Sequence, residues 1–236
     1  WQKYHSLLPA DYQALISPRY ALNDILHLEK LIGSNCESIS LLKPYLGHLY
    51  YRLHFYSLQE RYLDEFIPVL ENLQLRVMDQ VQFSFSIAGS TATIKSFTVK
   101  AAKSQCAPFS LLKSKLLETI QAVMEGRIEN DALNKLCVLV GMAWHEIDVL
   151  RAYRNYYLQI GYRTTHASYH HALINNPQVA LDLFRYFEAR FNPNREWNDP
   201  MLREEQLLFP LRMQLLASID SVSDLNDDRI LRTVFN

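Results

Sequence analysis

The apolar residues of this 236-residue chain alternate with a period of two only between residues 49 and 101. Such alternation places successive side chains on opposite faces of a strand. The first run, which predicts a half-buried strand, has these residues on one face: Leu49, Tyr51, Leu53 and Phe55. Two further runs cover 75–87 and 92–101, where a phase shift near Lys95 predicts a bulge and Gly89 predicts a hairpin turn.

Elsewhere the apolar spacing is that of helices. Ser17 as N-cap, Pro18 at the first helical position and Gly33 as the stop predict the first helix, with these residues on its buried face: Leu22, Ile25, Leu28 and Ile32. A second helix is predicted over 63–73, with Pro68 inside it, and a third from Phe109 to Gly126.

The order of elements predicts an α+β fold. Residues 48–126 follow the order strand, helix, strand, strand, helix, which builds an antiparallel sheet with helices on one face. After Gly126 we expect helices only, including the apolar run 136–140 and a long region that begins at Asp199-Pro200 and is interrupted by Pro210. The predicted domains are therefore 1–126, an N-terminal helix and an α+β module, and 127–236, a helical domain.

Composition excludes several classes of function. The net charge of -1 gives no general attraction to phosphate backbones, so nucleic acid is not an expected partner. The closest two of the six glycines are 14 residues apart, so the sequence contains neither of the two glycine-rich nucleotide-binding motifs, G-x-G-x-x-G and G-x-x-x-x-G-K-[ST]. The longest charge-free stretch, 164–181, holds too many polar side chains for a membrane span. The three cysteines have neither metal nor disulfide spacing, which favours a reducing, cytoplasmic location: Cys36, Cys106 and Cys137.

We find no residues arranged for catalysis, cofactor binding or metal binding. His166 and His170 share one helix face and His171 lies beside them, but two ligands do not close a metal site. His145-Glu146 lacks the second histidine of a zinc protease motif. Adjacent carboxylates at 204–205 and 227–228 are explained by helix capping and solvation. Cys106 has a lysine nearby in sequence, but an incidental thiol is the expected interpretation.

Arginine use changes along the chain. Up to residue 126 there are 8 Lys and 4 Arg, and from residue 127 there are 1 Lys and 11 Arg. Because arginine makes planar, bidentate contacts, the second half is expected to use it to connect helices or domains. A general compositional bias explains the same numbers.

Several strings, in the correct order, resemble the middle region of the large bacterial NAD-dependent glutamate dehydrogenases. These are Leu8-Pro9-Ala10-Asp11-Tyr12, the segment 68–73 with Leu75-Arg76-Val77, and Glu129-Asn130-Asp131 with Asn134. In the second half the strings resemble the helical linker that precedes the catalytic domain of that family: Leu150-Arg151-Ala152-Tyr153, the segment 187–193 (FEARFNP) and Asp228-Arg229-Ile230-Leu231-Arg232.

This resemblance implies a parent enzyme that oxidatively deaminates glutamate to 2-oxoglutarate and ammonium with NAD. The substrate-binding lysines and nucleotide fold of the family come after this region, so the fragment would have no cofactor of its own and the frame would continue past residue 236. The family also carries ACT-type modules, small ferredoxin-like units of regulation and subunit contact, which would fit residues 1–126. The implied partners are the catalytic domain of the same chain and other subunits of a homo-oligomer.

Three departures from the family pattern bear on these expectations. Gln74 stands where a glycine is expected to end the helix, so the helix is predicted to end differently. The turn 57–61 has no glycine, which argues against the binding of an amino-acid effector, and a complete ACT module needs a fourth strand that only 136–140 could supply. Pro210 predicts a kink or an insertion.

The leading hypothesis is a non-catalytic regulatory and architectural segment of such a dehydrogenase. One alternative is a free-standing ACT-like amino-acid sensor that dimerises through its sheet edge. Another is a purely helical docking adaptor.

Overall fold

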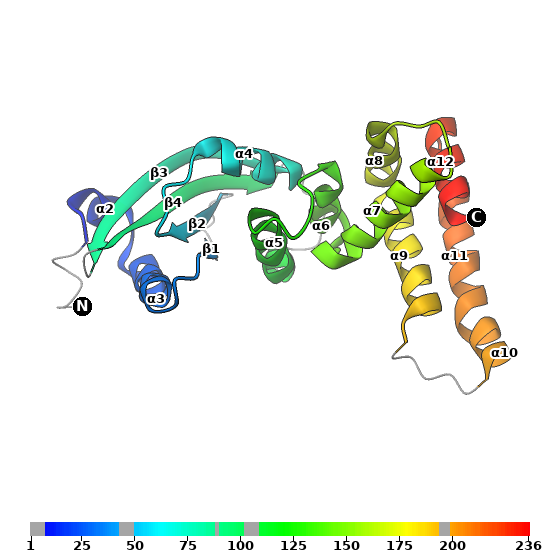
Figure 1. Cartoon of the computed structure of the whole chain (residues 1–236), viewed down its shortest axis with the longest axis horizontal. Helices are drawn as coiled ribbons and strands as arrows, with labels where there is room; N and C mark the ends of the chain where they lie inside the picture. Colours follow the sequence, from blue (N-terminus) through cyan, green and yellow to red (C-terminus); the bar gives the residue numbers. More distant parts are fainter. Residues whose placement is uncertain (1–7, 43–49, 88–89, 102–108, 194–198) are drawn as a thin grey trace. The chain divides into compact units, whose positions relative to one another are not determined.

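The computed structural model describes residues 8–42, 50–87, 90–101, 109–193 and 199–236 (Figure 1). Its contacts divide the chain into two compact units. The first unit comprises residues 1–104 and 120–127, and the second comprises residues 105–119 and 128–236. The α+β class predicted from the sequence is confirmed.

The first unit contains a four-stranded antiparallel sheet with the order β1-β2-β4-β3. Its strands are β1 (Ser38–Leu42), β2 (Tyr51–Ser57), β3 (Leu75–Ile87) and β4 (Ser90–Ala101). Both β2 and β3 pair with β4 in antiparallel register, so they run parallel to each other with β4 between them, as in a split βαβ unit. Strand β1 was not predicted, and it occupies the free edge of β2.

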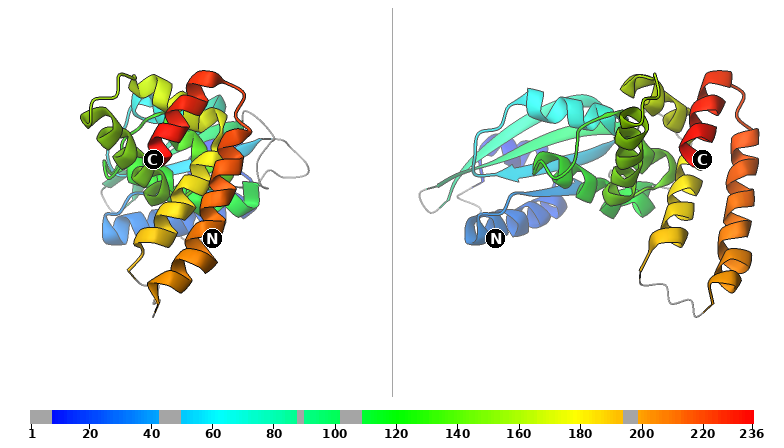
Figure 2. Two further views of the ribbon diagram at one scale, coloured as in Figure 1. Left: turned by 90° about the vertical axis from the view of Figure 1, so that its right-hand side faces the viewer. Right: turned by 45° about the vertical axis from the view of Figure 1, so that its right-hand side comes forward.

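Helices cover both faces of this sheet (Figure 2). On one face, α3 (Pro18–Ser34) contacts β2 through Asp24, which accepts hydrogen bonds from His54 and Tyr56. On the other, α4 (Leu63–Asn72) packs Phe66 edge-on against Phe55 at a centroid distance of 4.6 Å. The prediction of helices on one face holds for the helices that follow β2, whereas α2 (Ala10–Leu15) and α3 fill the opposite face.

Coverage of both faces explains two corrections to the strand predictions. Residues 53–57 of β2 are all buried, so this strand is not half-buried. The bulge lies in β3 at Met78, between the pairs of Val77 and Asp79, whereas Lys95 keeps regular register with Phe55 and Gln82. Apolar residues on both faces of β4 produce the apparent change of phase there. Gly89 and Leu49 lie outside the described residues.

The helix boundaries are mostly as predicted, with differences at two ends. Helix α3 begins at Pro18 as expected but ends at Ser34. Its C-cap is Asn35, rather than Gly33, and Asn35 adopts the left-handed conformation with a φ of 51°. Its buried face contains Ala21, Asp24, Ile25, Leu28 and Leu31, whereas Leu22 is 64% exposed. Gln74 does adopt the left-handed conformation, with a φ of 55°, so the prediction of a different end for α4 is wrong.

After Arg127, the described residues form helices and turns and contain no strand. The helices are α6 (Lys135–Val140), α7 (Trp144–Gln159), α8 (His166–Asn175), α9 (Pro177–Phe191), α10 (Pro200–Arg203), α11 (Phe209–Asp220) and α12 (Leu225–Phe235), with a short 3-10 helix at Ala132–Asn134. The run 136–140 is helical as predicted and supplies no strand. A π-helical segment, Glu204–Leu208, precedes Pro210 and is the irregularity that this proline predicted.

Helix α5 (Phe109–Met124) is divided between the two units, and Gly126 follows it at a φ of 69°. The sheet of the first unit excludes a purely helical adaptor. No described helix is both long and apolar enough to cross a membrane.

Candidate functional site

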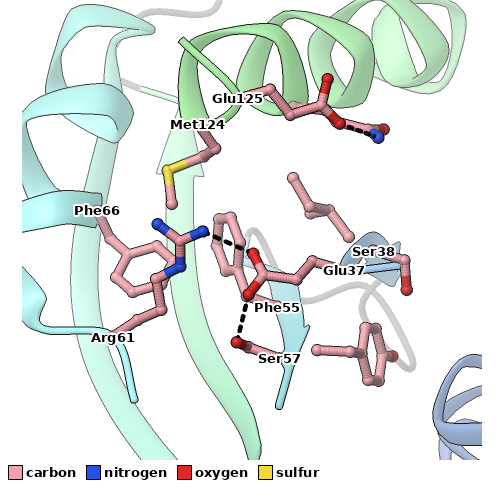
Figure 3. A pocket seen from close by; sticks show the side chains of 11 residues that line it. Glu37, Ser38, Phe55, Ser57, Arg61, Phe66, Met124 and Glu125 are labelled. Atoms are coloured by element: carbon pink, nitrogen blue, oxygen red, sulfur yellow. Dashed lines mark hydrogen bonds and ion pairs between the residues drawn. The ribbon is translucent and has the colours of Figure 1, made fainter. Parts of the chain in front are cut away.

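The first unit has a pocket of about 110 Å³ on the face of the sheet covered by α4 (Figure 3). Strands β1 and β2, the segment that enters α4 and the last turn of α5 all contribute to it. The residues that line it are Glu37, Ser38, Ile39, Phe55, Tyr56, Ser57, Arg61, Phe66, Gln121, Met124 and Glu125. All of them belong to the first unit.

Arg61 is the central polar group of the pocket. Its Nη2 donates to Glu37 at 2.8 Å and its Nη1 donates to Glu65 at 2.9 Å. These two hydrogen bonds raise the pKa of the guanidinium, and the hydrogen bond to Glu65 has the larger effect. The Arg61 Nε–H is buried and has no hydrogen-bond partner among the described residues. The pocket therefore holds one donor that is not satisfied.

Local sequence fixes this arginine in place. Glu65 is the third residue of α4, and its Oε1 accepts the backbone N–H of Tyr62 at 2.8 Å, as in a capping box. This hydrogen bond, followed by that from Arg61, lowers the pKa of Glu65. On the strand side, the Ser57 hydroxyl donates to Glu37 at 2.5 Å. A helix start and a strand end thus hold the Arg61–Glu37 ion pair from two directions.

The remaining walls are largely apolar. Phe55 and Phe66 are 6% and 2% exposed, and Met124 of α5 reaches toward them (Figure 3). Glu125 accepts from Gln121 at 2.7 Å and from Arg127 at 2.6 Å, and these contacts lower its pKa. Among the described residues that line the pocket, the charged side chains are Glu37, Arg61 and Glu125.

The three histidines singled out from the sequence lie on α8 and do not converge. His170 Nε2 lies 3.0 Å from Arg154 Nη1, and burial lowers the pKa of this imidazole. His166 contacts the edge of His170, whereas His171 is exposed and lies near Asp227. Among the described residues, no three potential ligands come together as a metal site.

The other candidates have structural contacts. Glu146 accepts the backbone N–H of Ala143 at 2.7 Å and so caps α7, while His145 contacts Trp144. Cys137 is buried, and burial raises the pKa of its thiol to about 11. Cys36 is exposed, and Cys106 lies outside the described residues.

Asp227 and Asp228 lie in the first turn of α12, at a helix start as predicted, but the expected solvation is wrong for Asp227. Asp224 caps α12 by accepting the N–H groups of residues 226 and 227, whereas Asp227 is only 1% exposed. Asp227 accepts from Asn175 at 3.2 Å and so connects α12 with α8. Asp228 pairs with Arg232, and Glu204 pairs with Arg212.

Sequence reasoning missed the ionic cluster around Asp131. Arg151 Nη2 and Arg154 Nη1 both donate to this carboxylate at 2.9 Å, and each arginine is only 2% exposed. Burial alone raises the pKa of Asp131, but the hydrogen bond and charge of Arg151 outweigh it and lower the pKa. Arg151 also donates to Asn134 at 2.7 Å. The change from lysine to arginine after residue 126 was the signal for such helix-to-helix contacts.

The chain is similar to one protein-family model and to several curated proteins. Residues 128–193 match the family model "Glutamate dehydrogenase, helical motif 3". The NAD-specific glutamate dehydrogenases of Pseudomonas aeruginosa, Halomonas elongata and Mycobacterium tuberculosis are 29%, 25% and 23% identical to the chain. Their matches cover 95%, 98% and 97% of the chain and 14% of the length of each relative.

Nearly the whole chain is thus similar to a segment of the large NAD-specific glutamate dehydrogenases, which confirms the predicted resemblance. The part that matches the family model is helical motif 3. That motif lies in the second unit and includes Asp131 and the two buried arginines, Arg151 and Arg154.

Proposed function

We propose that this chain is a non-catalytic regulatory and architectural segment of a large NAD-specific glutamate dehydrogenase. The observation that carries the proposal is that the relatives match nearly the whole chain with only 14% of their own length. The parent enzyme would convert glutamate, with NAD as hydride acceptor, to 2-oxoglutarate and ammonium. Residues 1–126 and 127–236 would act as an α+β domain and a helical domain of that enzyme in the cytoplasm.

The topology of the first unit supports an ACT-like, ferredoxin-like assignment. The segment β2–α4–β3 with β4 inserted is the split βαβ core of such a module. Strand β1 lies beside β2, at the edge that a fourth strand would complete, but it comes before the core in sequence. We propose that this module meets other subunits and that the helical domain meets the catalytic domain.

The division of roles is tested with two proteins: the 236-residue chain and the full product of the gene. The chain alone is expected neither to form NADH from glutamate and NAD nor to bind NAD in calorimetry, because it has no glycine-rich nucleotide loop. The full product is expected to do both. Turnover by the isolated chain, or a native stop codon after Asn236, would contradict the proposal.

A second candidate function is the binding of an amino acid in the pocket of Figure 3. The specific observation in its favour is the buried, unpartnered Nε–H of Arg61 beside an apolar wall. A ligand carboxylate would accept from this donor, and a small apolar side chain would lie against Phe55 and Phe66. The volume of about 110 Å³ limits the side chain to a small one.

Calorimetry with a panel of amino acids tests this second function. Micromolar binding is expected for small apolar amino acids, and Arg61→Gln should weaken it about 100-fold, since hydrogen bonds to charged groups contribute about 1.5–3 kcal/mol. Arg19→Gln, on the exposed surface of α3, is the matched control. Equal affinity of the Arg61 and Arg19 variants would exclude the pocket as the binding site.

A further inference from the structure

The second unit has a hollow of about 640 Å³ whose composition differs from that of an ordinary protein surface. Five tyrosines from α7, the segment after it and α9 line the hollow: Tyr153, Tyr156, Tyr157, Tyr162 and Tyr186. The last residues of α12 line it as well. None of the described lining side chains is acidic. Enrichment in aromatic residues and arginine with depletion of carboxylates is typical of the centre of a protein interface.

Large apolar side chains are exposed together at this hollow. Tyr156 is 62% exposed, Phe191 56%, Ile160 52% and Tyr162 45%. Single exposed apolar residues are common on protein surfaces, whereas a group of them around one concavity marks an interaction site. One of these rings is already held in place, because Tyr162 stacks on the buried Tyr157 at a centroid distance of 4.5 Å. Binding would therefore not have to order this side chain.

The charge at the hollow selects the chemistry of its occupant. Arg190 lines the hollow and lies over the ring of Phe191, 5.4 Å from its centroid. Arg229 is close enough to Tyr157 to act on its hydroxyl electrostatically. A complementary partner needs carboxylates around an apolar anchor. A second copy of the same surface would bring a second Arg190 and no acidic side chain from the described lining residues, which disfavours self-pairing.

We propose that this hollow is the docking surface for another part of the parent dehydrogenase: a segment outside residues 1–236 that presents carboxylates around an apolar side chain. The inference rests on the proposed function, because the relatives are about seven times as long as the stretch that this chain matches. A covalent extension of the same polypeptide is present at high effective concentration, so even an open, partly polar hollow can hold it.

Photo-crosslinking in the full product of the gene tests the surface. The photoreactive amino acid p-benzoylphenylalanine is placed at position 156 or, as a control in the first unit, at position 62, because Tyr156 and Tyr62 are 62% and 63% exposed. Position 156 is expected to crosslink to a peptide outside residues 1–236 that contains at least two carboxylates, and mass spectrometry identifies that peptide. Position 62 is expected to give at least tenfold less of this product.

Arg190→Glu and Arg190→Lys then test the role of charge. The glutamate variant should reduce the crosslink about tenfold, a change of about 1.4 kcal/mol, and the lysine variant should retain most of it. Crosslinks only to residues 1–236 of another copy, the absence of a crosslink, or equal yields from the two variants would overturn the docking proposal. A gene product that ends at residue 236 would instead overturn the proposed function, so the two failures are distinguishable.

Discussion

Each of the two units contains a carboxylate that accepts several hydrogen bonds. In the first unit its partners are two tyrosine hydroxyls and a histidine, whereas in the second unit they include two arginines. Asp24 in the first unit is 1% exposed and accepts from the hydroxyls of Tyr12 and Tyr56, each at 2.6 Å, and from His54 at 3.0 Å. Asp131 in the second unit is bound by two arginines, Arg151 and Arg154. The first cluster depends on hydrogen-bond geometry, whereas the second depends on permanent charge.

This difference determines which side chains lose a hydrogen-bond or ion-pair partner when the carboxylate is removed. Removal of Asp24 takes the acceptor away from the Tyr12 hydroxyl, whereas the Tyr56 hydroxyl keeps its hydrogen bond with Ser40 at 2.8 Å. Burial together with the charge of Asp24 raises the pKa of both tyrosines.

Removal of Asp131 leaves Arg151 and Arg154, each 2% exposed, with ion-pair partners that are 51% and 56% exposed, Asp148 and Glu129. A buried charge that loses its less exposed partner is costlier than an unsatisfied neutral donor. The comparison therefore predicts a larger loss in the second unit.

The largest effect is expected for Asp131→Ala. This variant should lower the free energy of unfolding of the second unit by about 3–5 kcal/mol, measured by denaturant unfolding and by hydrogen exchange of α7 and α8. Asp148→Ala is the matched control, because Asp148 contacts the same Arg151 at 3.4 Å but is 51% exposed. Its loss should be about 0–1 kcal/mol. Similar losses for both variants would show that the cluster does not stabilise the unit through buried charge.

Asp24→Ala is expected to have the next largest effect, about 2–3 kcal/mol, on hydrogen exchange of β2 and α3. Tyr12→Phe removes one donor and leaves the other two, so it should cost about 1 kcal/mol. If Tyr12→Phe were as destabilising as Asp24→Ala, the carboxylate would not be the centre of this cluster.

Acid should affect the second unit before the first. Burial lowers the pKa of His170 below its ordinary value of 6.5, so the unfolded chain binds a proton that the folded one does not. The contribution of the neutral His170 to the free energy of unfolding is therefore fully present above pH 6.5. It is lost as the pH falls from 6.5 toward the lowered pKa. The folded pKa values of Asp24 and Asp131 lie below 3.8, so their contributions are lost only below about pH 4.

Hydrogen exchange between pH 7 and 5 measures this difference. Protection of α7 and α8 should decrease with falling pH, while protection of β2 and β4 changes less. His170→Gln should remove the decrease, whereas the exposed His145→Gln should not, because His145 makes no contact with the Asp131 cluster in the described structure. An unchanged pH profile of the His170 variant would refute the assignment of the titrating group.

The contrast between the units also explains what the sequence revealed. Period-two runs located β2, β3 and β4, and the helical pattern located the long helices, because each has one strongly apolar face. Strand β1 was missed since only Ile39 and Leu41 alternate with serines before the segment ends. Asp24 lies on the buried face of α3, where the pattern alone predicts an apolar residue. Its partners, His54 and Tyr56, are 30 and 32 residues away in sequence.

The pocket and the hollow depend on similarly distant partners. Glu37 and Arg61 are 24 residues apart in the sequence, and no recognisable motif contains both of them. Tyr156 and Ile160 are four residues apart, the spacing of one helix face, yet they are 62% and 52% exposed. Periodicity shows that a face is apolar, whereas only the packing of α7, α9 and α12 shows which apolar residues remain uncovered. Sequence therefore predicted the elements and the family but not the two candidate binding surfaces.

The smallest effect concerns left-handed backbone positions, which the two units fill differently. In the described part of the first unit, Asn35 and Gln74 adopt φ values of 51° and 55° in addition to Gly126, whereas in the described part of the second unit such positions are taken by glycines, Gly141 and Gly161. Gln74→Gly should therefore stabilise the first unit by up to about 1 kcal/mol, because glycine is free of the Cβ clash of a left-handed residue. Asn35→Gly should give less, since asparagine tolerates this conformation.

The opposite change tests the same argument in the second unit. Gly141→Ala would add a Cβ at a φ of 68° and 3.1 Å from Leu112 Cδ2, so it should destabilise by about 1–2 kcal/mol. Gly161→Ala, with no atom within 4 Å of its Cβ, should lose only the conformational part. Thermal unfolding of the four variants gives the order: Gln74→Gly above wild type, Asn35→Gly near it, Gly161→Ala below it and Gly141→Ala lowest. A destabilised Gln74→Gly would mean that the Gln74 side chain contributes more to the fold than its backbone strain costs.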